Sequence, residues 1–380
     1  MLGMAATQAL VNPELLAWAR QRSGLSDAVL AKKLNVKLER IAEWELGTSR
    51  PTFKQAQNIA KHTHTPFGFL FLPEPPQESL PIPDLRTIEN RELDQPSPEL
   101  RDVIAQAKKK QEWYRDYLIS NDFPRNQFVG SITLQTPIQV AVTTIRNAIK
   151  VGVPTTGKWE DYQRELIEGA ESAGVMVMRS GIVGSNTHRK LQVSEFRGFA
   201  ITDEFAPLIF INSSDAPAAR LFTLIHELAH IWLGSSGISD LGSSRRSEER
   251  YCNQVAGEFL VPATKLREAW SHTRSFLDNC ASIAIAFHVS KLVVAKRAAD
   301  INLVTSDEYS AFYRAELEKY KSSSGTSGNF YNSARAKNSL MLSRAVVSEA
   351  KRGRMLLRDA GRLLGIPPHA LRTYASTLPK

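Results

Sequence analysis

Cysteine and long apolar runs are scarce in this chain of 380 residues. Its 2 cysteines cannot build a disulfide framework and fit a reducing cytoplasm. No apolar run approaches the roughly 20 residues that span a membrane, and the first ten residues lack the basic start and apolar core of a signal peptide. With 42% hydrophobic residues, a chain of this length can bury a sizeable core. We therefore expect a cytoplasmic protein of two or three domains.

The sequence also shows no glycine-rich phosphate-binding loop before a helix and no array of repeats. Histidine is scarce as well, with 8 residues, yet two stand four apart in the motif HELAH at 226–230. Residues four apart share a helix face, so His226 and His230 can hold one zinc ion. Glu227 is placed to act on a water at the metal. The alternative is a buried helix whose two histidines are satisfied within the core.

A zinc site with two histidines needs a third protein ligand and an open position for water. Residues 247–260 have the apolar spacing of a second helix, with Ser247 as its N-cap. Glu249 on this helix is the candidate ligand, and Asn253, on the same face, could orient one histidine. The adjacent Glu248 leaves the choice open. Two solvated acids at a helix start are the alternative.

The segments TLIHELAHIWLG and EERYCNQVAGEFLVP resemble the ImmA/IrrE family of metallo-endopeptidases. That family pairs an HExxH helix with a helix of the form E-x-x-A-N-x-F-A-x-x-L-L-x-P. This chain differs in carrying Cys252 and Val255, both still small or apolar, and we expect Cys252 to face the core rather than to be a fourth ligand. The resemblance implies zinc ligands and a general base: His226, His230 and Glu249, with Glu227 as the base.

Two apolar segments before the motif predict a strand pair. FRGFAIT (196–202) and PLIFIN (207–212) are separated by a turn at 203–206, and residues 174–179 are a third candidate strand. In zinc peptidases, an edge strand beside the metal helix holds the substrate chain extended. The alternative is an ordinary sheet that packs behind a helix.

The front of the chain, residues 11–72, predicts a bundle of short helices. Ser26 is expected to cap a helix that ends at Leu34, and a short turn leads to a helix over 37–46. The segment LAKKLNVKLERIAEWELGTSRPT resembles the XRE family of repressor-like DNA-binding domains. The resemblance implies a five-helix domain whose helix at 37–46 reads a double-stranded DNA operator.

By this resemblance, five residues are candidate DNA contacts. Lys37, Glu39 and Arg40 would face the major groove, and Arg50 and Lys54 would contact phosphates. The charge balance is modest, because residues 1–75 hold nine Lys/Arg against six Asp/Glu. A bundle that serves only interaction or dimerisation is therefore the alternative.

The predicted DNA-binding domain is followed by a proline-rich linker at 73–96. Its PIPDLRT element is typical of proteins that fuse XRE to an ImmA/IrrE peptidase. We assign the peptidase domain to 97–320. Within it, residues 277–305 have the sequence pattern of a second helix-turn-helix.

The end of the chain is basic. A flexible tether is predicted at 321–329, and 357–376 has the cadence of a third helix-turn-helix. Residues 331–380 hold ten Lys/Arg and two Asp/Glu, a net charge of +8, whereas the whole chain has +9. This helical region, 330–380, is either a surface for DNA or an acidic partner, or a solvated basic domain.

Together these patterns predict a mainly α, α+β protein. It would join a lambda-repressor-like domain, a zincin-like domain with a small sheet and a helical basic tail. The predicted function is a DNA-binding transcriptional regulator with a zinc-dependent endopeptidase that cleaves a protein such as a repressor. The alternative is a DNA-binding antitoxin or sensor that binds a toxin or other partner without cutting it. A second copy of the chain is a further candidate partner.

Overall fold

The structure, a computed structural model, describes residues 7–76, 96–154, 159–234, 243–320 and 330–379. It divides into two compact units, residues 1–81 with 94–102 and the remainder of the chain. Helices dominate both units and the second holds a small sheet, which confirms the predicted mainly α, α+β class. Most of the predicted linker and the whole predicted tether lie outside the described residues.

The first unit is a bundle of short helices around its own core. Its elements are α1 (Pro13–Arg22), α2 (Asp27–Leu34), α3 (Leu38–Glu45), α4 (Phe53–His62) and the 3-10 helix η1 (Phe67–Phe71). Ser26 caps α2 by accepting a hydrogen bond from the Val29 amide at 3.3 Å. Asn35 then takes the left-handed conformation, with φ 55°, which ends α2 and leaves a tight turn before α3. The predicted cap and turn are both present.

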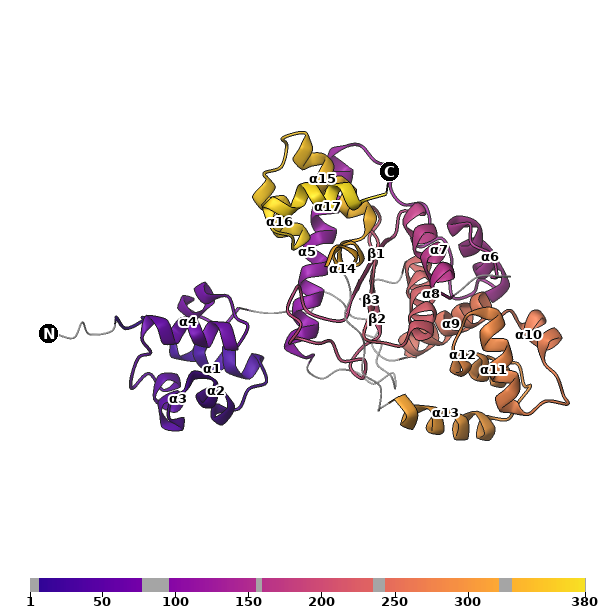
Figure 1. Ribbon diagram of the computed structural model, residues 1–380, viewed down its shortest axis with the longest axis horizontal. Coiled ribbons are helices and arrows are strands. Elements are labelled where there is room, and N and C mark those ends of the chain that lie inside the picture. Colours follow the sequence, from indigo (N-terminus) through magenta and orange to yellow (C-terminus); the bar gives the residue numbers. More distant parts are fainter. Residues whose placement is uncertain (1–6, 77–95, 155–158, 235–242, 321–329, 380) are drawn as a thin grey trace. The chain divides into compact units, whose positions relative to one another are not determined.

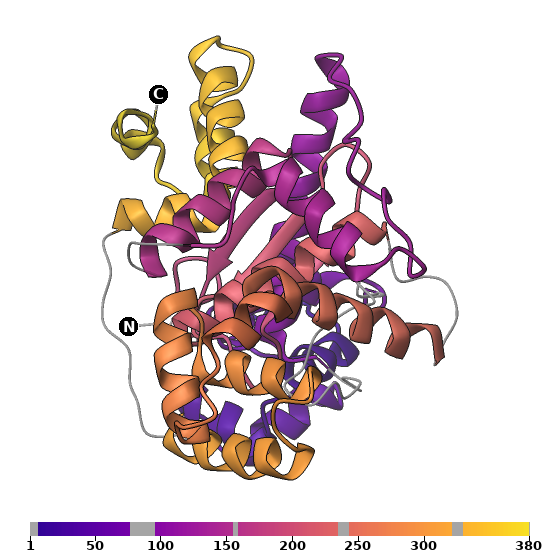
Figure 2. The same cartoon turned by 90° about the vertical axis from the view of Figure 1, so that its right-hand side faces the viewer.

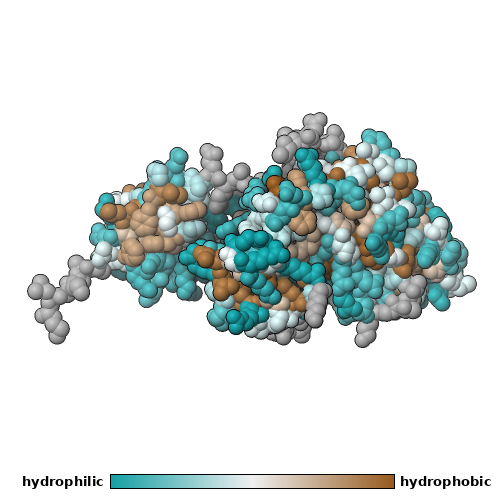
Figure 3. All heavy atoms as spheres, turned by 90° about the horizontal axis from the view of Figure 1, so that it is seen from above, coloured by the Kyte–Doolittle hydropathy of each residue, from teal (hydrophilic) through white to brown (hydrophobic). Residues whose placement is uncertain are grey.

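Buried apolar side chains hold this bundle together. Ile41 and Trp44 of α3 pack with residues of the other helices, and Leu70 of η1 closes the core. On the surface of this unit, hydrophobic residues gather on the face that Figure 3 shows. Among its exposed apolar side chains, Leu46 is 77% exposed. The module therefore buries one face of each helix and leaves the outer face of α3 accessible.

The second unit is built on a three-stranded sheet with the order β1-β3-β2. The strands are β1 (Met176–Ser180), β2 (Gly198–Ile201) and β3 (Leu208–Asn212). β1 runs parallel to β3, and β2 pairs antiparallel with it, so β2 is an edge strand. All five residues of β3 are buried, as expected for a central strand covered on both faces.

Helices make up most of the rest of this unit. The described ones are α5 (Pro98–Ser120), α6 (Ile138–Ile149), α7 (Trp159–Ser172), α8 (Pro217–Leu233), α9 (Ser243–Leu260), α10 (Ala263–Ala269), α11 (Phe276–Phe287), α12 (Lys291–Asp300), α13 (Ser306–Tyr320), α14 (Phe330–Asn338), α15 (Leu340–Lys351), α16 (Leu357–Leu364), η2 (Pro368–Ala370) and α17 (Leu371–Thr377). Figure 1 shows α7 and α8 on one side of the sheet, and α5 and α14 on the other. Figure 2 shows the orange helices and the yellow C-terminal helices at different ends of this unit.

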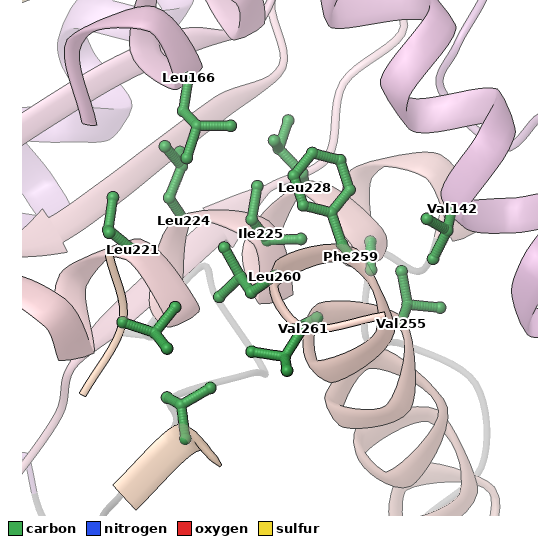
Figure 4. Packing of buried hydrophobic residues seen from close by; sticks show 14 of the residues in the cluster. Val142, Leu166, Leu221, Leu224, Ile225, Leu228, Val255, Phe259, Leu260 and Val261 are labelled. Carbon is green, nitrogen blue, oxygen red and sulfur yellow. The ribbon is translucent and has the colours of Figure 1, made fainter. Parts of the chain in front are cut away.

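The main core lies between the sheet, α8 and α9. Leu224 and Leu228 of α8 belong to one buried cluster with Val255 and Phe259 of α9, and Figure 4 shows part of this cluster. The sequence predicts the start of this second helix at Ser247, which is wrong, because α9 begins one turn earlier. The serines and arginines before Ser247 are compatible with a helix. A possible N-cap at Ser247 is therefore not enough to fix where the helix begins.

The segment predicted as a second helix-turn-helix forms α11 and α12. The two helices are bent by 110° at a short turn, where His288 is left-handed with φ 54°. Val294 and Ala298 of α12 are fully buried in the main core. No single described helix has the length and apolarity to cross a membrane; by those two criteria alone, only this bent pair passes when taken together.

Candidate metal centre

The motif at 226–230 lies in the middle of α8, as the sequence predicts. His226, Glu227 and His230 are 0%, 3% and 4% exposed. The helix ends at Gly234, whose left-handed φ of 68° suits glycine. A Cβ there would lie 2.7 Å from the Cα of Gly130, so the chain also approaches too closely for a side chain. The amides of Gly130 and Ile132 donate to the last carbonyls of α8 and fix this end.

Glu249 of α9 faces the two histidines. The Nε2 atoms of His226 and His230 are 3.1 Å apart. The Glu249 carboxylate lies 3.4 Å from His226 Nε2 through Oε2, and 3.2 Å from His230 Nε2 through Oε1. Among the described residues, these three form the group of ligand atoms that could hold a metal ion. The third candidate ligand, 23 positions after His226, is thus brought to the histidines.

The donor set and its spacing fit a zinc ion. Two imidazole nitrogens and a carboxylate oxygen are ligands that zinc accepts, and tetrahedral zinc at about 2.0–2.1 Å keeps its ligands roughly 3.3 Å apart. The three separations, from 3.1 to 3.4 Å, match that geometry. His226, His230 and Glu249 would hold the ion and leave a fourth position open.

Electrostatics in the cluster favour a positive charge between the three groups. Burial raises the pKa of the Glu249 carboxyl, but hydrogen bonds from both histidines outweigh it and hold the pKa well below its usual range. Burial lowers the pKa of His230, whereas Cys252, Glu249 and Glu227 together raise it well above the ordinary value. A divalent cation bound by the same atoms would replace the proton as the compensating charge.

Glu227 sits beside the edge strand β2. A Cβ built on Gly198, the first residue of β2, would lie 3.4 Å from Glu227 Oε1, 2.5 Å from Thr223 Cγ2 and 2.9 Å from the Phe210 carbonyl oxygen. Only glycine leaves room for α8 to approach the strand this closely. Gly198 is a residue of the site that the sequence motifs do not reveal. A glycine inside the apolar strand segment was the available signal.

Models of known protein families match separate parts of the chain. A helix-turn-helix model matches residues 16–70, and an IrrE N-terminal-like domain of peptidase type matches 170–299. The chain joins an XRE-type helix-turn-helix domain to an ImmA/IrrE-type peptidase domain. A domain of unknown function (DUF8813) matches residues 338–377, which cover α15 to α17. Comparison with curated proteins found no match, and comparison with solved structures found none either.

Within the ImmA/IrrE-type domain, Cys252 and Asn253 differ in their contacts. Cys252 is fully buried in the core, as expected, and burial raises the pKa of its thiol. Asn253 is half-buried, and in the described part of the chain no hydrogen bond joins it to either histidine. Neither residue is shown to position a histidine, so the role of Asn253 in orienting one stays a prediction.

In the XRE-type domain, the candidate DNA contacts are accessible. Lys37, the N-cap of α3, is exposed, as are Glu39 and Arg40 on the helix. Arg40 forms an ion pair with Glu43 one turn later, at 2.8 Å. Arg50 and Lys54, before and within the first turn of α4, are exposed too. The module supports binding of double-stranded DNA, and the residue assignments remain predictions.

Proposed function

We propose that this DNA-binding regulator uses its ImmA/IrrE-type domain as a zinc-dependent endopeptidase on a protein substrate. The observation that carries the proposal is the convergence of three ligand atoms, from His226, His230 and Glu249, beside the buried carboxylate of Glu227. Two imidazoles and a carboxylate with an open position form a hydrolytic type of zinc site. A buried core pair of histidines would not need a carboxylate from a second helix within 3.4 Å of both.

The edge strand β2 supports a substrate held in extended form. β2 pairs with β3 on one side only, and Gly198 brings its backbone close to the Glu227 carboxylate. A peptide that adds as a further strand would pass next to Glu227. Strand addition uses main-chain hydrogen bonds, so it suits a protein substrate of varied sequence.

When bound, zinc would polarise the peptide carbonyl and acidify a water at its open position. Glu227 would accept the proton of the attacking water and deliver it to the amine nitrogen that leaves. The low exposure of Glu227 keeps bulk water from competing for that proton. The packing of α8 against α9 would hold the three ligands, His226, His230 and Glu249, in place around the ion.

Glu227→Gln tests the proposal. It keeps the side chain's size and removes the base, so cleavage should fall by at least about 100-fold. Zinc content, measured by atomic emission on the purified protein, should stay near one per chain. Cleavage of candidate repressors encoded beside this chain's gene would be followed by mass spectrometry. If the regulatory effect persists at full strength in this variant, the non-cleaving antitoxin or sensor replaces the peptidase as the function.

A further inference from the structure

A cavity of 260 Å³ lies on the opposite face of the sheet from the metal helix. It is lined by residues of α5, β1, β3, α14 and α16, which Figure 1 shows on that side. Met178 and Phe210 line it, whereas their neighbours Val177 and Ile209 belong to the core that contains α8. Alternate residues of a strand face opposite sides. The cavity is therefore separate from the metal centre.

Positive charge is concentrated in this cavity. Four cationic residues line it: Lys109, Lys110, Lys337 and Arg362. None of the lining residues carries a carboxylate, and no carboxylate in the described part of the chain pairs with Lys110 or Lys337. Clustered cations repel one another, so a site built this way is stabilised by an anion.

Lys110 is half-buried and donates to two neutral oxygens. Its Nζ donates to Asn338 Oδ1 at 2.7 Å and to the Lys337 carbonyl at 3.4 Å. Burial, with the nearby charge of Lys337, lowers the pKa of Lys110 to about 8. Lys337 donates to the Gly184 carbonyl at 2.8 Å, and burial lowers its pKa too. Both ammonium groups are thus held by neutral oxygens alone, and each has donor capacity left for a ligand.

The rest of the wall is apolar. Met178, Ile182, Phe210 and Leu363 all line the cavity. Its volume lies just below the roughly 300–1,000 Å³ of pockets that take drug-sized ligands. A phosphate group carries up to two charges and several strong acceptors, which suits several cations better than one carboxylate does. We propose that this cavity binds a small phosphate-bearing organic molecule, with its phosphate at Lys110, Lys337 and Arg362.

Calorimetry on the full-length protein tests the site with phenyl phosphate as the probe, and with inorganic phosphate and phenol as its two halves. Phenyl phosphate should bind saturably at one per chain and more tightly than either half. Lys110→Met and Arg362→Gln should each weaken binding at least about tenfold, because each removes a charge-assisted hydrogen bond. Lys108→Met is the matched control, since Lys108 lies on the same helix but pairs with Glu112 and does not line the cavity. It should leave the affinity unchanged.

Three results would overturn the proposal. One is no saturable binding of phenyl phosphate. Another is phenol binding as tightly as phenyl phosphate, which would mark a purely apolar cavity. The third is unchanged affinity in both cavity variants, which would place the phosphate elsewhere, including at the metal centre. Because Lys110 is half-buried, circular dichroism checks that its variant folds. If the Lys110 variant does not fold, the variant at the exposed Arg362 tests the site.

Discussion

At the residue scale, the proposed cleavage chemistry depends on how closely α8 approaches β2. Gly198 permits this approach, because any Cβ there would meet Thr223, the Phe210 carbonyl and Glu227. The contact joins residues about 29 positions apart in the chain, which periodicity cannot reveal. The two histidines could be predicted from the sequence because both lie on one helix, four residues apart.

Gly198→Val should therefore push Glu227 away from its position. Overpacking a core site costs typically about 1–3 kcal/mol, and the Glu227 shift should reduce cleavage further than that loss of stability explains. Urea unfolding and the cleavage rate, measured on the same preparation, check this. Ala200→Val, two residues along the same strand and half-buried, is the control. Equal losses of cleavage in both variants would contradict the role of Gly198.

A buried ion pair links α9 to α12. The Arg297 guanidinium pairs with Glu258, which also accepts from Gln139 at 2.6 Å. Arg297→Met leaves the Glu258 carboxylate buried without its cation, so we expect a loss of about 3 kcal/mol in unfolding free energy. Lys296→Met, on the exposed side of the same helix, should change it by less than about 0.5 kcal/mol. A double variant with Glu258→Gln should recover part of the loss.

At the element scale, helix types and most strands follow from the sequence, and boundaries follow less well. α2 ends where Asn35 and its left-handed turn predict, because a cap is a local event. The start of α9 that the sequence predicts, Ser247, is too late, since nothing in Ser247 prevents the helix from beginning at Ser243. The cavity lay beyond sequence reasoning altogether, because α5 and α14 are more than 200 positions apart.

Helix α3 carries the prediction for DNA. Arg40→Ala should weaken binding of the operator by about 1–3 kcal/mol and relax specificity at one base position. Lys54→Ala should instead weaken binding to all sequences alike and lower the salt slope by about one. Fluorescence anisotropy across a salt series separates the two effects. A uniform loss for Arg40→Ala, without any change in base preference, would rule out its place in the major groove.

At the scale of the whole molecule, the two units have separate cores and should respond separately to metal. A ligand at 100 times its dissociation constant stabilises a fold by about 2.7 kcal/mol. Chelation should then lower the melting temperature of the second unit by about 5 °C or more and leave that of the first unchanged. Differential scanning calorimetry measures both transitions.

A variant without the histidine ligands provides the matched control for chelation. His226→Ala with His230→Ala should melt at one temperature with and without chelator. If the native protein also shows no shift, the three ligand atoms do not hold a metal under those conditions.

Strand β3 contributes to both faces of the sheet. Ile209 and Ile211 belong to the core that contains α8, and Phe210 lines the cavity. Side chains along a strand alternate with a period of two, so inserting or deleting one residue in β3 would exchange its two faces. Such an indel would carry Phe210 into the core of the metal site and an isoleucine into the cavity. Mutations of this kind would remove both sites in a single step, whereas point substitutions can alter either site alone.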